Sequence, residues 1–239
     1  MPLLEVCVDE SAGLAAAVAG GADRIELCSA LGIGGLTPSQ GFMREAAQCG
    51  VKCRAMIRPR GGDFVFDRRE ISVMCADIAA AREVGLEGVV IGAATDRKTL
   101  DLPTLQKLIA AAGAMELTLH RVVDTLHDPV AAVADAARLG FDTILSSGGA
   151  PTALDGHATL RRMHQSAGAG LTIMAGSGVD VASVPVLATQ GLRAFHASCS
   201  AALAAQEEDP LGFAAGRGKQ TDAEMVRALK SAIGKACAL

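Results

Sequence analysis

The sequence predicts a single-domain α/β protein that folds as a (β/α)8 TIM barrel over residues 1–239. Its length suits one large α/β domain, and no linker or composition break divides it. One unit recurs along the chain: a helical stretch ends at a glycine, a polar link follows, and a short apolar run comes next. Gly21, Gly85, Gly140 and Gly191 mark four copies, because glycine readily adopts the left-handed conformation that ends a helix.

Short apolar runs of this kind are typical of buried parallel strands, and here they recur roughly every 27 residues, the size of a βα unit. We predict strands over residues 3–8, 23–28, 53–58, 88–92, 115–120, 142–147, 171–176 and 193–198. Predicted helices fill the gaps, over residues 11–19, 39–48, 67–84, 101–112, 128–139, 155–167, 180–190 and 221–235. We expect residues 200–220 to form an irregular loop before the C-terminal helix. Eight units favour the closed barrel, and a doubly wound open sheet is the alternative.

Composition excludes several classes of protein. The chain is 50% hydrophobic and 20% charged, which excludes disorder. A net charge of −4 and an aromatic content of 3% disfavour nucleic-acid binding, since phosphates attract cations and bases stack on rings. No apolar run reaches the ~18 residues that span a bilayer, and the N-terminus lacks a signal-peptide pattern. We therefore expect a soluble, cytoplasmic protein with no membrane partner.

The seven cysteines are odd in number and irregularly spaced. A disulfide framework is therefore not expected in a cytoplasmic chain of this size. Cys49 and Cys53 lie close in sequence, but Gly50 should end the preceding helix between them, so this pair carries little weight as a metal site.

Two Glu-x-Cys pairs end the first two predicted strands. Side chains alternate across a strand, so Glu5 shares a face with Cys7, and Glu26 shares one with Cys28. If both pairs point into the barrel, the two thiols could meet at its top with the carboxylates below them. Two soft thiolates would suit Cu(I). The alternative is that both are ordinary buried cysteines.

Polar residues also end the other strands, where a TIM barrel carries its chemistry. Arg58, Arg60 and Asp63 follow the third strand. Arg58 could neutralise Glu5 or Glu26, because a buried carboxylate needs a partner. Arg60 is interpreted either as a clamp for a substrate anion or as part of a structural ion-pair network.

His120, Arg121 and Asp124 close the fifth strand. A histidine at the mouth of a barrel can act as an acid, a base or a metal ligand, and the alternative is a buried, hydrogen-bonded side chain. Loops after the seventh and eighth strands often bind phosphate in this fold. Backbone N–H groups of a glycine turn can bind an anion, and the alternative is a tight turn that needs glycine for its shape alone. The candidate anion-binding residues are Arg60, Asp63, Ser147, Gly176, Ser177, Gly178, His196 and Ser198.

These motifs together resemble the CutC family, usually called copper homeostasis proteins. The resemblance covers roughly residues 3–200, and its most specific stretch is Ile57-Arg58-Pro59-Arg60-Gly61-Gly62-Asp63-Phe64. It implies a TIM barrel, and it implies Cu(I) ligands at Cys7 and Cys28. The chain departs from the family pattern at Ile33, where an acidic residue is usual, and it matches poorly after Ser200.

Three functions follow from these observations. The first is a cytoplasmic copper homeostasis protein that binds Cu(I) through Cys7 and Cys28. The second is an enzyme acting on a small anionic or phosphorylated metabolite, with His120 as acid or base and with Glu5, Glu26, Arg58 and Asp124 as further catalytic candidates. The third is a barrel whose site has decayed, which leaves a structural role. No organic cofactor is implied, and the resemblance together with the alanine-rich helices suggests a homo-oligomer.

Overall fold

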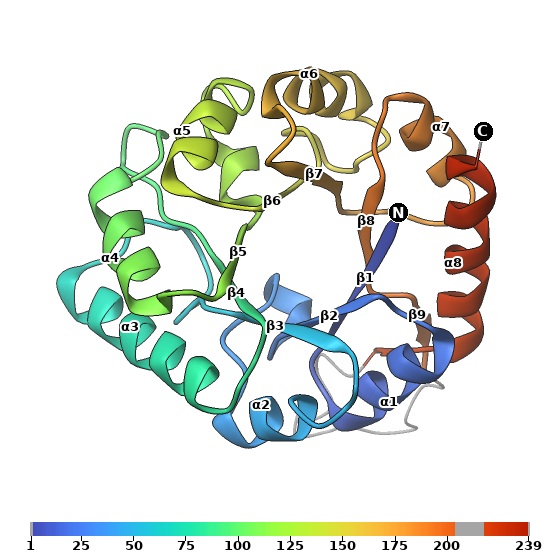
Figure 1. Ribbon diagram of the computed structural model, residues 1–239, viewed down its shortest axis with the longest axis horizontal. Coiled ribbons are helices and arrows are strands. Elements are labelled where there is room, and N and C mark those ends of the chain that lie inside the picture. Colours follow the sequence, from blue (N-terminus) through green and yellow to red (C-terminus); the bar gives the residue numbers. More distant parts are fainter. Residues whose placement is uncertain (1, 204–217, 239) are drawn as a thin grey trace.

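A closed barrel of eight parallel strands forms the centre of the protein (Figure 1). The computed structural model describes residues 2–203 and 218–238. The strands follow in sequence order, and the last one pairs with the first. They are β1 (Leu3–Val8), β2 (Arg24–Leu27), β3 (Lys52–Met56), β4 (Gly88–Ile91), β5 (Glu116–Leu119), β6 (Thr143–Ser146), β7 (Thr172–Ala175) and β8 (Ala194–Ala197). The predicted TIM barrel is therefore confirmed, and the open sheet is excluded.

A ring of helices covers the outside of the barrel (Figure 1). They are α1 (Ser11–Gly20), α2 (Gln40–Ala46), α3 (Arg68–Glu83), α4 (Leu102–Ala112), α5 (Ala131–Leu139), α6 (His157–Ala167), α7 (Val184–Thr189) and α8 (Ala223–Cys237). Gly21 and Gly140 end their helices in the left-handed conformation, with φ of 87° and 86°. Asp101 caps α4 by accepting a hydrogen bond from the Thr104 N–H.

Two short 3-10 helices were not predicted. They are η1 (Leu31–Ile33) and η2 (Arg121–Thr125), which lie in the segments after β2 and β5. Segments of three to five residues are too short to show a hydrophobic period, so sequence patterns do not reveal them.

The outside and the inside of the barrel differ in chemistry. Outward-facing apolar residues such as Leu4, Val6 and Ile25 pack against the helices in one continuous core. The alternate positions point inward, and many of them are buried yet polar: Glu5, Arg24, Glu26, Arg54, Thr118, His120 and His196. Buried polar groups cost stability unless they are paired, so the side chains inside the barrel need partners there.

At the N-terminal end of the strands, an ion network fills the barrel. The Arg54 guanidinium donates to Thr118 Oγ1 and to Asp142 Oδ1, each at 2.7 Å. Its other nitrogens lie 3.5 Å from Glu116 Oε2 and 3.8 Å from Glu87 Oε2. These four partners come from β4, β5 and β6 or the residues just before them, so the network ties neighbouring strands together.

Past β8 the chain forms a small antiparallel sheet. Its strands are β9 (Ser200–Ala202) and β10 (Lys219–Thr221). They are the two ends of the predicted irregular loop 200–220, and residues 204–217 of that loop lie outside the described residues. Within the described part of the chain, no helix is both long and apolar enough to cross a membrane.

Candidate functional site

A cavity of about 430 Å³ opens at the C-terminal end of the strands, which we call the mouth. Strands β1, β2, β3, β6 and β8, the segments that follow β2, β3, β5, β7 and β8, and the small sheet of β9 and β10 contribute to its wall. Its polar and ionisable side chains are Cys7, Glu26, Arg58, His120, Arg121, Ser177, Asp180, His196, Ser198, Cys199, Ser200 and Lys219. The mouth therefore carries the candidate site, as the polar residues at the strand ends predicted.

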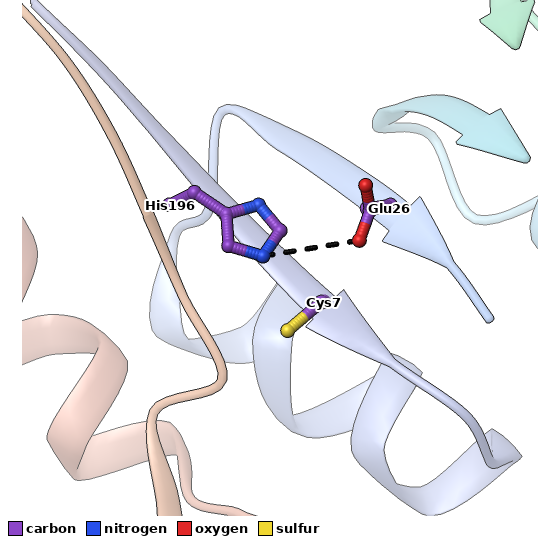
Figure 2. A group of neighbouring side chains, drawn as sticks. All are labelled: Cys7, Glu26 and His196. Carbon is purple, nitrogen blue, oxygen red and sulfur yellow. Dashed lines mark ion pairs between the residues drawn. The ribbon is translucent and has the colours of Figure 1, made fainter. Parts of the chain in front are cut away.

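Three side chains form a compact cluster in this wall. Cys7 on β1, Glu26 on β2 and His196 on β8 each place one potential ligand atom within 4.8 Å of the other two (Figure 2). All three residues are buried. The β1–β2 register sets Cys7 directly beside Glu26. A thiol, an imidazole and a carboxylate at this spacing can hold a metal ion.

His196 is oriented by a second carboxylate below the cluster. Its Nδ1 donates to Glu5 Oε1 at 2.7 Å, while Glu5 Oε2 lies 2.5 Å from the Arg24 Nε. Burial alone would raise the pKa of Glu5, but Arg24 and His196 outweigh burial and lower this pKa to about 2. An ionised carboxylate behind an imidazole fixes its orientation and leaves the other ring nitrogen for a ligand.

That other nitrogen, His196 Nε2, lies 3.8 Å from Glu26 Oε2 (Figure 2). Burial opposes a charge on the ring, but Cys7, Glu26 and Glu5 around it raise the pKa of His196 well above its usual value. A metal ion at this nitrogen would therefore have to displace a proton.

Glu26 has an unmatched atom. Its Oε2 accepts a hydrogen bond from Cys28 Sγ at 3.5 Å, but its Oε1 is buried and has no hydrogen-bond partner among the described residues. Burial raises the pKa of Glu26 to about 6. A buried oxygen without a partner costs stability, so this atom fits a site that a cation or a hydrogen-bond donor completes.

Cys28 lies beside the cluster, not in it. Its side chain packs with Met56, Val90 and Leu31, and a Cβ at Gly35 would stand 3.0 Å from its sulfur. Burial raises the pKa of the Cys28 thiol well above its usual value. The sequence suggested that the two thiols could meet above the two carboxylates, but the register sets Cys7 beside Glu26.

The reason is the stagger of the strands. Cys7 is paired with Glu26, so the two Glu-x-Cys pairs are offset by two residues. A barrel closes only when neighbouring strands are staggered, and a single sequence does not reveal that offset.

A second thiol lines the same cavity beside Cys7. Cys199 follows β8, is buried, and has a φ of 45°, in the left-handed region that non-glycine residues rarely adopt. Burial raises the pKa of this thiol to about 11. Sequence reasoning stopped at Ser198, although the neighbouring position of Cys199 at the end of a barrel strand was a usable signal.

His120 presents a neutral ring to the cavity. Its Nδ1 accepts a hydrogen bond from the Val122 N–H at 3.1 Å, so the proton lies on Nε2. That buried Nε2 has no partner among the described residues. Burial, together with the charge of Arg58, lowers the pKa of His120 to about 3. Such a ring is a weak base at neutral pH and is better suited to donating a hydrogen bond to a ligand oxygen.

Gly92 makes room for this ring. A Cβ there would stand 2.4 Å from His120 Cε1, and Phe64 covers the ring at 4.9 Å between centroids.

Arg58 organises loops instead of neutralising the glutamates. It donates to the carbonyl oxygens of Ile33, Gly35 and Gly62 at 2.9–3.2 Å. Within the described residues it forms no ion pair with Glu5 or Glu26, and Arg24 takes that role for Glu5. The expectation that Arg58 neutralises a glutamate is therefore wrong, because Arg24, in register with Glu5, is nearer.

Arg60 and Asp63 lie apart from the cavity wall. Arg60 pairs with Glu70 at 2.5 Å and with Asp63 at 3.0 Å. Its guanidinium is thus committed to the loop after β3. This geometry corresponds to the structural ion-pair interpretation of Arg60.

Asp124 holds the loop after β6 in place. It accepts hydrogen bonds from Ser146 Oγ at 2.6 Å, from Ser147 N at 3.0 Å and from Gly149 N at 3.0 Å. Arg121 donates both to Asp124, at 2.8 Å, and to Ser147 Oγ, at 2.9 Å. Of these residues it is Arg121 that reaches the cavity wall. Sequence reasoning treated it only as a neighbour of His120.

The predicted anion-binding turn reaches the cavity. Ser177 and Gly178 line it with φ of 78° and 66°, and a Cβ at Gly176 would stand 2.4 Å from Leu145 Cδ1. Ser198 lines the same wall, and Lys219 of β10 adds a cation that sequence reasoning missed. Gly176, Ser177 and Gly178 thus come together with His196 and Ser198, as expected, whereas Arg60 and Asp63 do not join them.

Comparison with known proteins supplies the family. The profile of the CutC family matches residues 2–201. A CutC family protein of Rhizobium meliloti (strain 1021) is 48% identical over 231 residues, covering 95% of this chain and 94% of the relative. One from Xanthomonas campestris pv. campestris (strain 8004) is 41% identical over 233 residues, covering 95% and 96%.

The comparison with solved structures gives the same family. CutC from Streptococcus agalactiae, a protein assigned to copper homeostasis, superposes with a TM-score of 0.79 at 28% identity, covering 83% of this chain and 99% of that one. A thiamine phosphate pyrophosphorylase from Pyrococcus furiosus, 12% identical with a TM-score of 0.61, shares the fold alone. The resemblance expected from the motifs is confirmed: the chain belongs to the CutC family.

Proposed function

We propose that this protein binds Cu(I) at the mouth of the barrel and serves copper homeostasis. The observation that carries the proposal is the buried Cys7–Glu26–His196 cluster, whose ligand atoms all lie within 4.8 Å of one another. The solved relative from Streptococcus agalactiae, assigned to copper homeostasis, supports it. Copper is the cargo in this proposal, so the barrel binds the ion and keeps it from water without transforming it.

The donor set decides the roles within the cluster. Cu(I) prefers soft thiolates and accepts imidazole, whereas carboxylates suit harder ions. Cys7 therefore anchors the ion and His196 Nε2 is the second ligand, with Glu5 behind Nδ1 holding the ring. Glu26 supplies negative charge beside the ion.

Cys28 completes the site if its thiol leaves Glu26. At 3.5 Å its Sγ donates to Glu26 Oε2, an atom of the cluster itself. Rotation about the side chain would bring a second thiolate toward the ion, as the family resemblance implies. The proposal thus has Cys7 as the constant ligand, with His196 and Cys28 as its partners.

Affinity measurements test these assignments. The reduced protein is titrated with Cu(I) against a competing chelator under anaerobic conditions. We expect Cys7→Ser to abolish stoichiometric binding, and His196→Ala and Cys28→Ser each to weaken it by at least the roughly 10- to 100-fold that loss of an outer-shell partner causes. Cys75→Ser is the matched control, because Cys75 is a half-buried thiol on α3, outside the barrel. Unchanged affinity in Cys7→Ser would refute the proposal.

A second candidate function rests on a different observation in the same cavity. Arg121, Lys219, the Ser177–Gly178 turn and the unpartnered His120 Nε2 face one space of about 430 Å³. Cations, backbone amides and a neutral donor suit a small anionic or phosphorylated metabolite. This enzyme would use His120 to donate a hydrogen bond to a substrate oxygen.

A thermal-shift screen of phosphorylated metabolites tests this alternative. A compound that stabilises the protein should lose its effect in Arg121→Ala, while Arg138→Ala, which removes an exposed arginine paired with Asp135 on α5, should keep it. A hit that is insensitive to Arg121→Ala would argue against this site.

We include a cytoplasmic location and a homo-oligomeric state in the proposal, and gel filtration with light scattering checks the oligomeric state.

A further inference from the structure

A pair of thiols lies at the end of the barrel opposite the mouth. Cys49 follows α2 and Cys53 lies in β3, and their sulfur atoms are 3.7 Å apart. The proposed copper site uses neither residue. We propose that Cys49 and Cys53 are a modification site, where a low-molecular-weight disulfide such as oxidised glutathione introduces an intramolecular disulfide bond.

The local backbone brings the two sulfurs together. Gly50 adopts a φ of 79°, which turns the chain sharply between α2 and β3. Both thiols then point at one carbonyl: Cys49 Sγ is 3.5 Å and Cys53 Sγ 3.3 Å from Val51 O. A disulfide has an S–S length of about 2.05 Å, so an approach of about 1.7 Å closes the bond.

The two thiols differ in access. Cys49 is half-buried and lies between the exposed residues Gln48 and Gly50. Cys53 is only 3% exposed. An external disulfide therefore reaches Cys49 first. The buried Cys53 thiol reacts only afterwards, with the Cys49 sulfur that carries the mixed disulfide.

The thiol–disulfide exchange with oxidised glutathione takes two steps. The Cys49 thiolate attacks one sulfur of oxidised glutathione, which forms a mixed disulfide and releases one glutathione thiolate. Burial raises the pKa of the Cys53 thiol, so its proton passes to the departing glutathione sulfur as the Cys53 sulfur attacks the Cys49 sulfur and releases the second glutathione. The two cysteine protons end on the two glutathione thiols, and the two electrons that the protein loses reduce the glutathione disulfide.

The bond would tie α2 to β3 without reaching the copper site. The neighbouring Lys52 pairs with Glu87, and Arg54 enters the ion network at the N-terminal end of the strands. The cross-link therefore constrains the closed end of the barrel, while the Cys7–Glu26–His196 cluster lies at the other end. The inference does not depend on the proposed function.

Peptide mapping tests the proposal, because trypsin separates the two cysteines. Cleavage after Arg44, Lys52 and Arg54 puts Cys49 in residues 45–52 and Cys53 in residues 53–54. The metal-free, reduced protein is equilibrated with mixtures of oxidised and reduced glutathione, quenched with acid and digested without reductant. We expect the two peptides to be recovered joined by a disulfide.

Two variants measure the expected difference in reactivity between Cys49 and Cys53. In Cys53→Ser, Cys49 should accumulate as its mixed disulfide with glutathione, because the second step has no attacking thiol. In Cys49→Ser, Cys53 should stay a free thiol, because it is buried. Cys75 in the wild-type protein is the internal reference: it is half-buried, and any adduct there should stay a mixed disulfide.

Three results would overturn the proposal. They are recovery of the two peptides unjoined at every glutathione ratio, a mixed disulfide that persists at Cys49 in the folded wild-type protein, and a disulfide that joins either cysteine to another partner.

Discussion

The two ends of the barrel interior carry similar residues but treat them differently. At the N-terminal end, the Arg54 guanidinium faces Asp142 at 2.7 Å and Glu87 at 3.8 Å. Arg54 Nε and Glu87 Oε2 have no hydrogen-bond partner among the described residues, but they face each other as opposite charges. At the mouth, Glu26 Oε1 and His120 Nε2 are buried beside a cavity with no partner among the described residues. Opposite charges therefore fill the N-terminal end, whereas the unpartnered atoms at the mouth face a cavity and indicate a place for a ligand.

Removing a charge at the closed end should have the largest effect on stability. Arg54→Met leaves acidic groups without their cation, and breaking a buried pair costs roughly 3–5 kcal/mol. Asp142 and Glu116 are partly exposed, with side-chain exposures of 30% and 52%, so we expect about 3 kcal/mol. Urea denaturation measures this loss, and the Cu(I) affinity of the folded fraction should stay unchanged.

Lys52→Met is the matched control for that experiment. Lys52 pairs with the same Glu87, but its side chain is 73% exposed, and exposed pairs contribute about 0–1 kcal/mol. Equal losses in the two variants would mean that burial of the network is irrelevant to the stability of the closed end.

His120 should make the folded protein less stable as the pH falls. Its pKa is about 3 in the folded protein against 6.5 normally, so below pH 6.5 the unfolded chain takes up a proton that the folded one refuses. Stability is therefore lost as the pH falls, by about 1.4 kcal/mol per pH unit, or about 2 kcal/mol between pH 6.5 and about 5.

The comparison with His120→Gln isolates this contribution. Denaturation of both proteins across that pH window should show a loss in the wild-type protein that the variant lacks, because changes in other groups, including Glu26, cancel in the difference. Parallel pH profiles would show that His120 is not held neutral.

Glu26→Gln should give the smallest stability effect, with the opposite sign. Burial raises the pKa of Glu26 to about 6, so at pH 7.5 the folded protein holds an unfavourable buried charge. An amide of the same shape removes that cost, and we expect stabilisation by about 1 kcal/mol together with weaker Cu(I) binding. Destabilisation would contradict the assignment of Glu26 to the ligand site.

Sequence reasoning located the framework well because the signals are local. Each predicted strand lies within two residues of the observed one, since apolar runs that follow Gly21, Gly85, Gly140 or Gly191 mark strand starts directly. The candidates Glu5, Cys7, Glu26 and His196 were also found locally, from their places at strand ends.

What sequence reasoning missed depends on contacts between distant segments. The offset that sets Cys7 beside Glu26 follows from barrel closure. The pairing of Glu5 with Arg24 and the arrival of Lys219 at the cavity depend on register and on the path after β8. The low pKa of His120 follows from burial, which alternation along a strand does not quantify.

X-ray absorption at the copper edge tests the central claim most directly. The reduced wild-type protein is loaded with one equivalent of Cu(I), and the coordination shell is compared with those of His196→Ala and Cys75→Ser. The account predicts sulfur together with imidazole nitrogen around copper, with the nitrogen lost in His196→Ala and kept in Cys75→Ser. A shell of sulfur alone that is unchanged in His196→Ala would contradict it.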